Sequence, residues 1–273
     1  GDNIFNGAND NASGTTAVLS LAKHYKELDS NSRSILFVLF TAEEMGLIGS
    51  RYFGEKINPD SIIAGINIEM IGKESPFGEK TAWLTGFERS NFGKIVQKNL
   101  EGSEYKLYPD PFIGYRLFYR SDNAALARLG IPAHTFSTSP MDKDLDYHKV
   151  TDEVSTLDMY TITETIKAIA VGTSSLISGE DTPTRISIDD EKANDLAINS
   201  PGSQIENSMD MIITNKEIDI VDICLPPHLH FSTALKFLKA DKHVICEKPL
   251  STSVNEAQKL IDVSNSMNKN LYP

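Results

Sequence analysis

Two adjacent carboxylates, Glu43 and Glu44, follow directly after an apolar run at residues 34–40. The run is rich in β-branched and aromatic side chains and is typical of a buried parallel strand. Open α/β sheets bind their ligands beyond the carboxyl ends of such strands. Because neighbouring residues point in different directions, one carboxylate can bind a metal ion while the other accepts a proton. The alternative interpretation is an exposed acidic loop, in which Glu favours the start of the following helix.

Three further side chains suited to metal binding stand near the ends of expected elements. Asp10 lies in a turn rich in Asn, Asp and Gly before a helix expected at residues 15–28, where its alternative role is that of an N-cap. Glu69 follows an apolar strand expected at residues 62–68, and His148 lies in a polar loop. Oxygen ligands with one imidazole suit Zn²⁺, and a bridging carboxylate would allow two ions.

Hydrolytic chemistry at such a site needs a base that the metal does not saturate. Two metal ions roughly 3.5–4 Å apart can polarise a substrate carbonyl and activate water. Glu43 is the expected base, because it stands beside the expected ligand Glu44. Tyr147 can donate a hydrogen bond to the oxyanion that develops on the substrate. The residue types therefore indicate metal-dependent hydrolysis.

Alternating strand and helix patterns surround these residues and predict an α/β fold. Residues 108–119 form an aromatic and Pro-rich loop, for which a substrate-pocket wall and a packed surface loop are equal alternatives. Further strands are expected at residues 81–84 and 131–136, and helices at 46–55, 91–100, 121–129 and 156–177.

The composition of the 273-residue chain limits its partners and divides it in two. A net charge of −12 argues against nucleic acid and anionic membrane surfaces. No apolar run approaches the roughly 18 residues of a spanning helix. Every Arg lies at or before Arg185, and residues 178–184 are polar and turn-rich, as in a linker. We therefore predict a boundary near Ile186, with one domain at residues 1–186 and another at 187–273.

The second segment shows a βαβ rhythm, which predicts a parallel sheet. A buried strand is expected at residues 218–225 and another strand at 243–246, with helices at 191–197, 208–213, 231–239 and 254–267.

Four motifs of the first segment occur in an order that resembles the dinuclear-zinc aminopeptidase family. They are Asn9–Gly14, Thr41–Ser50, Asn67–Gly72 and the pair Tyr147-His148. The resemblance covers residues 1–186. It implies a zinc-exopeptidase-like α/β/α sandwich with a mixed sheet, two zinc ions, and a peptide or aminoacyl substrate.

The same resemblance implies a role for each site residue. Asp10 would bridge the two zinc ions, Glu44 and His148 would complete one site, and Glu69 would serve the other. Glu43 would be the general base. The family usually has Asp at the position of Glu69, and its His-x-Asp motif precedes the bridging Asp. Because this chain begins after that motif, we expect one zinc site to lack an imidazole and hydrolysis to be impaired.

Residues 218–250 resemble the nucleotide-binding domain of the glucose–fructose oxidoreductase and inositol dehydrogenase family. The signature consists of Pro226, His230 and the Glu-Lys-Pro motif that contains Lys248. It implies a partial Rossmann-like sheet, with these residues at an NAD(P) site and Lys248 at the nicotinamide. The Gly-rich phosphate turn expected in front is missing, so we do not expect NAD(P) to bind this segment unaided. An incomplete sheet with exposed edges predicts self-association.

Three functions follow from these patterns. The first is aminopeptidase-like hydrolysis by residues 1–186, and the second is NAD(P)-dependent sugar or inositol oxidoreduction by residues 187–273. The third is an inactive mosaic of two gene fragments. The peptidase resemblance implies a periplasmic or secreted location, whereas the oxidoreductase resemblance implies a cytoplasmic one, so the location stays open.

Overall fold

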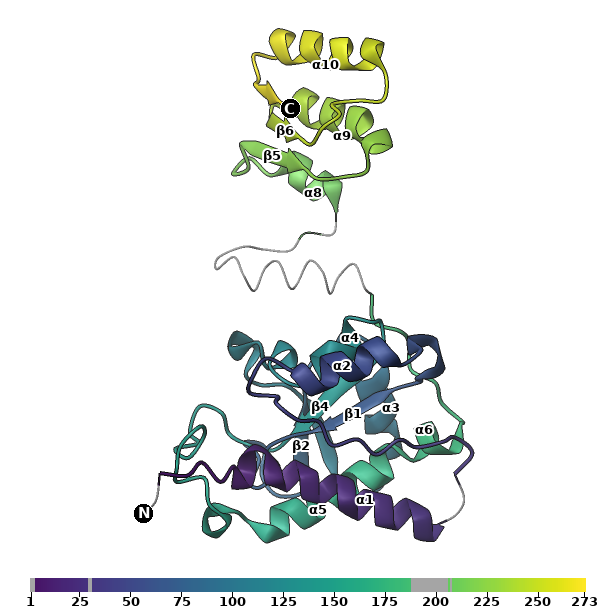
Figure 1. The fold of residues 1–273 in the computed structure, drawn as a ribbon, viewed down its shortest axis with the longest axis vertical. Coiled ribbons are helices and arrows are strands. Elements are labelled where there is room, and N and C mark those ends of the chain that lie inside the picture. The colour runs from purple at the N-terminus through teal and green to yellow at the C-terminus, as the bar shows by residue number, and fades with distance from the viewer. Residues whose placement is uncertain (1–2, 29–30, 188–205, 207) are drawn as a thin grey trace. The chain divides into compact units, whose positions relative to one another are not determined.

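A computed structural model describes residues 3–28, 31–187, 206 and 208–273. The chain divides into two compact units, Gly1–Leu196 and Ala197–Pro273 (Figure 1). Ile186 is buried against Phe118 and Ala127, so the first unit extends at least to this residue. The domain boundary expected near Ile186 stays a prediction, because the residues that follow lie outside the described ranges.

A four-stranded mixed sheet forms the centre of the first unit. Its strands are β1 (Gly65–Ile68), β2 (Thr81–Leu84), β3 (Lys106–Pro109) and β4 (Ala133–Ser137). The spatial order is β1-β4-β2-β3, with β1 parallel to β4, β2 parallel to β3, and β2 antiparallel to β4. The mixed sheet expected from the sequence is therefore confirmed.

Helices cover both faces of this sheet (Figure 1). They are α1 (Gly14–Leu28), α2 (Ile48–Lys56), α3 (Phe92–Asn99), α4 (Asn123–Ala127), α5 (Met159–Gly172) and α6 (Ser174–Ser178). Helix α5 packs on α1 and on α3, all three contact the sheet, and α2 packs on α4, which contacts β1 and β4. This arrangement is the predicted α/β/α sandwich. In the described part of the chain, no helix has the length and apolarity to cross a membrane.

The sequence of α1 shows how this packing arises. Ala17, Leu21 and Tyr25 recur every four residues and therefore lie on one face of the helix. All three are buried in the main core with Phe92 and Phe136, which come from α3 and β4. This burial fixes α1 on the sheet, and the turn that precedes α1 carries Asp10.

Residues 34–40 do not form the buried strand that their composition predicts. They lie wholly in the described part of the chain and pair with no strand there. Leu36, Phe37 and Leu39 are 64%, 41% and 55% exposed. A strand needs a hydrogen-bonded neighbour, and neither edge strand of this sheet, β1 or β3, pairs with residues 34–40. The apolar composition is right for a strand, but it does not supply a partner.

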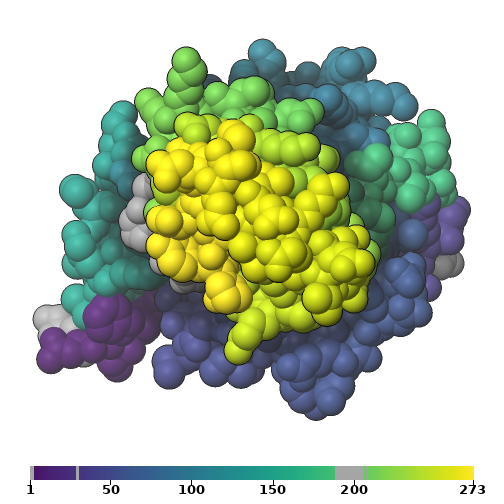
Figure 2. All heavy atoms as spheres, turned by 90° about the horizontal axis from the view of Figure 1, so that it is seen from above, coloured from purple at the N-terminus to yellow at the C-terminus, as the bar shows by residue number. Residues whose placement is uncertain are grey.

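The second unit has a three-stranded parallel sheet, which confirms the partial Rossmann-like prediction. The strands are β5 (Ile220–Ile223), β6 (His243–Cys246) and β7 (Leu271–Tyr272), in that spatial order. The helices are α8 (Met209–Thr214), α9 (Pro227–Lys239) and α10 (Val254–Ser266). The side chains of α10 and the chain end (yellow) form a continuous convex surface (Figure 2).

One strand prediction for the second unit is wrong in its burial. β5 was expected to be buried, but it is an edge strand and its Ile220 is 59% exposed. The core of this unit forms between the sheet and the helices α9 and α10, and it includes Val244, Phe237 and Leu260. The helix expected at residues 191–197 lies outside the described residues.

Candidate active site

Asp10 projects from a tight turn, Ala8–Ser13, that comes just before α1. The Asn11 side chain fixes this turn: its Oδ1 accepts from the amides of Gly14 (3.1 Å) and Met70 (3.2 Å), and its Nδ2 donates to the Ile68 carbonyl (2.9 Å). The amide that begins α1 is thus bonded to Asn11. The N-cap interpretation of Asp10 is wrong, and its carboxylate is available for other contacts.

Glu43 and Glu44 lie in a turn that leads into α2. The Glu43 carbonyl accepts from the amides of Gly46 (2.9 Å) and Leu47 (2.8 Å), which closes the turn. Gly46 adopts φ 94°, a left-handed value that favours glycine. Glu43 is half-buried, whereas the Glu44 side chain is 60% exposed. The two carboxylates therefore occupy different environments, as their different proposed roles require.

His148 lies in a loop that is anchored on both sides. The ammonium of Lys73 donates to the Asp146 carboxylate (2.8 Å) and to the Thr156 carbonyl (3.0 Å). The His148 ring stacks on the Tyr147 ring, with centroids 3.9 Å apart. The Tyr147 hydroxyl accepts from Nη2 of Arg120 at 3.3 Å. These contacts limit where the imidazole can move.

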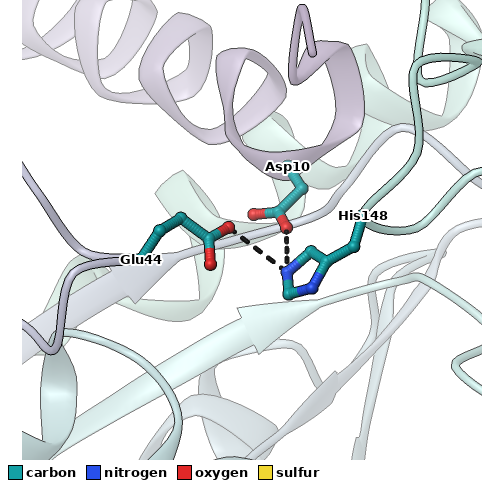
Figure 3. A group of neighbouring side chains, drawn as sticks. All are labelled: Asp10, Glu44 and His148. Carbon is teal, nitrogen blue, oxygen red and sulfur yellow. Dashed lines mark ion pairs between the residues drawn. The ribbon is translucent and has the colours of Figure 1, made fainter.

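Asp10, Glu44 and His148 point toward one another from three separate segments (Figure 3). His148 Nε2 lies 3.3 Å from Asp10 Oδ2 and 3.2 Å from Glu44 Oε1. Their ligand atoms all lie within 4.8 Å of one another. Imidazole nitrogens and carboxylate oxygens are zinc ligands, and catalytic zinc sites combine three protein ligands with an open fourth position. These residues fit Zn²⁺.

The electrostatics of the site favour a cation. Burial raises the pKa of Asp10 to about 6, and repulsion from Glu44 adds to the shift. Burial also raises the pKa of Glu43 to about 7, with repulsion from Glu44 and Asp122 as further causes, while Arg120 lowers it. Carboxylates that repel one another are stabilised in their charged form by a bound cation, so metal binding would lower these pKa values.

Glu69 follows β1 directly, as predicted, but it stays outside the three-residue group. Burial raises the pKa of its carboxyl to about 8, against the lowering effect of a hydrogen bond with Ser121. Repulsion from Asp10 and Glu43 adds to the rise, which places Glu69 in the same electrostatic neighbourhood. Its ligand role stays a prediction.

The predictions from sequence missed three side chains at this site. Asp122 stands at the start of α4, makes no capping hydrogen bond and lies buried next to Ser50, near Glu43. Arg120 lowers the pKa of Glu43 and donates a hydrogen bond to the Tyr147 hydroxyl. Asp152 hydrogen-bonds the backbone of Asp10. For Asp152 the available signal was its place in the same polar loop as His148.

The residues predicted to bind NAD(P) take different places in the second unit. Pro226 stands at the N-cap position of α9, and Lys248 is exposed. His230 is buried, with Nδ1 2.7 Å from the Pro249 carbonyl and Nε2 2.6 Å from the Leu225 carbonyl. In this structure His230 therefore joins the segments that follow β5 and β6. A role in NAD(P) binding stays a prediction for all three.

The sandwich fold makes the first unit an α/β domain. The carboxylate–imidazole group gives it a candidate metal site beyond the sheet. The chain belongs to peptidase family M28, whose family model matches residues 1–172. Residues 154–273 match the oxidoreductase family with an NAD-binding Rossmann fold. Both matches include residues 154–172, and in the structure α5 from this stretch packs against α1 and α3 of the first unit.

Curated relatives show the same division. Aminopeptidase Y of Saccharomyces cerevisiae is 26% identical over 175 residues, which are 60% of this chain and 32% of that protein. Aminopeptidase YwaD of Bacillus subtilis is 36% identical over 69 residues, or 24% and 15% of the two chains. An uncharacterized oxidoreductase of Schizosaccharomyces pombe is 35% identical over 68 residues, or 25% and 18%. The chain spans less than a third of the length of each.

Proposed function

We propose that the first unit catalyses metal-dependent hydrolysis of the peptide bond that follows the amino-terminal residue of a peptide or aminoacyl substrate. The observation that carries this proposal is the convergence of Asp10, Glu44 and His148 on one point. Membership of the M28 peptidase family and the aminopeptidase relatives support the reaction class.

The metal of the proposed reaction is zinc, on which the M28 family typically depends. Asp10, Glu44 and His148 would hold one ion, and Glu69 would serve a second ion that Asp10 bridges. When bound, zinc polarises the scissile carbonyl and makes water more acidic. With three protein ligands, the first ion would keep one coordination position open for substrate.

Glu43 would act as the general base. Its carboxylate is not part of the three-residue ligand group, so a lone pair is free to take a proton from water. A pKa of about 7 is close to the value that suits a base at neutral pH. As the peptide bond breaks, the same group would give the proton to the leaving amine.

Tyr147 would donate a hydrogen bond to the oxyanion. Burial raises the pKa of its hydroxyl to about 12, so the group keeps its proton at neutral pH. The Arg120 guanidinium donates to the Tyr147 oxygen, which leaves the hydroxyl hydrogen free to point toward substrate.

Glu43→Gln tests this proposal, because it removes the base and keeps the shape. We expect zinc to bind as before, while hydrolysis of aminoacyl-nitroanilides falls about 10²–10⁴-fold. Glu101→Gln, a substitution of an exposed Glu, is the matched control and should change neither property. A chain that binds no zinc, or equal rates for Glu43→Gln and the unsubstituted chain, would contradict the proposal.

The family match and the parallel sheet favour oxidoreductase ancestry for the second unit. NAD(P) binding would use Lys248, Pro226 and His230. We propose that this unit does not bind NAD(P) unaided, because the sequence contains no Gly-x-Gly-x-x-Gly turn for the pyrophosphate. Titration of the chain into NADH should leave the nucleotide fluorescence unchanged. A saturable change in NADH fluorescence would instead support an oxidoreductase function.

A further inference from the structure

The Asp152 carboxylate lies beneath the turn that carries Asp10. Its Oδ1 accepts from the amide of Asn9 at 2.8 Å, and its Oδ2 accepts from the amide of Asp10 at 3.0 Å. Asp152 is only 2% exposed. Hydrogen bonds from backbone amides to a buried carboxylate are charge-assisted and roughly twice as strong as neutral ones. Two successive amides that point at one anion form a rigid anion-binding arrangement.

The backbone of Asp152 extends this connection. Its carbonyl accepts from the amide of Ala8 at 3.2 Å, so three successive residues of the Asp10 turn donate to Asp152. Its own amide donates to the carbonyl of Lys149 at 3.1 Å, next to His148. Asp152 therefore connects the turn of one proposed metal ligand to the loop of another, although 142 residues separate it from Asp10.

Other contacts of the turn do not reach Asp10 in the same way. The Asn9 side chain donates to Ser139 Oγ at 2.8 Å and accepts from the amide of Gly72 at 2.8 Å. These bonds hold Asn9, whereas the Asp152 carboxylate bonds the Asp10 backbone itself. The direction of the Asp10 side chain depends on that backbone.

We infer that Asp152 is a positioning residue, which holds Asp10 at the distance from His148 and Glu44 that metal binding requires. This inference rests on the proposed function. Pre-arrangement matters because the ligands come from segments far apart in the sequence, and ordering them on binding would weaken affinity. Removal of such a supporting partner typically costs about 10–100-fold in metal affinity or activity.

Asp152→Asn tests the inference, because it keeps the shape and one acceptor oxygen but turns an NH₂ group toward one amide. We expect the dissociation constant for Zn²⁺, measured by calorimetric titration, to rise about 10–100-fold. The amides of Asn9 and Asp10 should exchange with solvent faster than in the unsubstituted chain. Asp142→Asn is the matched control: it removes a charge from an exposed residue of the same loop and leaves both amide bonds to Asp152 intact.

Several outcomes would overturn the inference. Rapid exchange of the Asn9 and Asp10 amides in the unsubstituted, metal-free chain would do so without any variant. Faster exchange with unchanged zinc affinity in Asp152→Asn would make the residue a purely structural one. Equal loss of affinity in Asp142→Asn would mean that charge alone matters. If the unsubstituted chain binds no zinc, the proposed function fails, and amide exchange still decides whether Asp152 holds the turn.

Discussion

Acidic side chains that repel one another define the site at the scale of single residues. Asp10, Glu43 and Glu69 all have raised pKa values, and burial is the main cause for each. Such an arrangement costs folding free energy at neutral pH unless a cation is present, so its persistence in the fold is best explained by function.

The pH dependence of hydrolysis follows from Glu43. The base must be deprotonated to accept a proton from water, so kcat/KM should rise with pH through the pKa of Glu43. That pKa is about 7 without metal and falls when a cation binds, so the midpoint should lie at or below about 7. A pH–rate profile checks this prediction. A rate that is flat from pH 5 to 8 would contradict it.

Sequence motifs located the proposed metal ligands better than the residues that contact them. Asp10, Glu44 and His148 were predicted from residue type and position, and the structure brings them together. Asp152 and Arg120 were missed as site residues because their roles depend on contacts across 142 and 27 residues of sequence. No local pattern encodes such contacts.

At the scale of elements, β4 depends on a buried histidine. His134 is fully buried, with Nδ1 2.9 Å from the Thr85 carbonyl and Nε2 2.8 Å from Ser90 Oγ. Burial lowers the pKa of its imidazole to about 4. These contacts give His134 a structural role in its strand.

This histidine predicts acid sensitivity. A neutral imidazole in the fold and a protonated one in the unfolded chain mean that His134 stabilises the fold less as pH falls from about 6.5 to about 4. The free energy of unfolding should drop by about 3 kcal/mol from this group over that range. Urea denaturation at several pH values measures the slope. His134→Gln should flatten it, and an unchanged slope would refute the assignment.

Strand prediction failed where the composition of a segment did not reveal its neighbours. Residues 34–40 and β5 both read as buried strands, yet the first pairs with no described strand and the second is an edge. Helices α1, α3 and α10 were predicted well, because each carries its own apolar face and closes its own hydrogen bonds. A strand depends on other segments both to bury its apolar side chains and to complete its backbone hydrogen bonds.

The exposed edge of the second unit gives a prediction about association. Ile220 on β5 is 59% exposed, and an apolar edge strand is a site for pairing with another chain. Ile220→Lys should lower the sedimentation coefficient at high protein concentration without loss of helical circular dichroism. Val254→Lys changes an 86% exposed residue at the start of α10 and serves as the control. Association that is equally strong in Ile220→Lys would show that this edge is not the contact.

At the scale of the whole molecule, the chain consists of two units with separate hydrophobic cores. Calorimetry should therefore show two unfolding transitions. A ligand stabilises only the unit that binds it, so zinc at 100 times its dissociation constant should stabilise the first unit by about 2.7 kcal/mol. The transition of the second unit should not move. A shift of both transitions, or of neither, would contradict this division of roles.

Anomalous diffraction from zinc-soaked crystals would show whether Asp10, Glu44 and His148 hold a zinc ion. We expect a zinc peak about 2.0–2.2 Å from His148 Nε2 and from a carboxylate oxygen of both Asp10 and Glu44. Zinc bound only elsewhere on the chain, or no peak between these three residues, would contradict it.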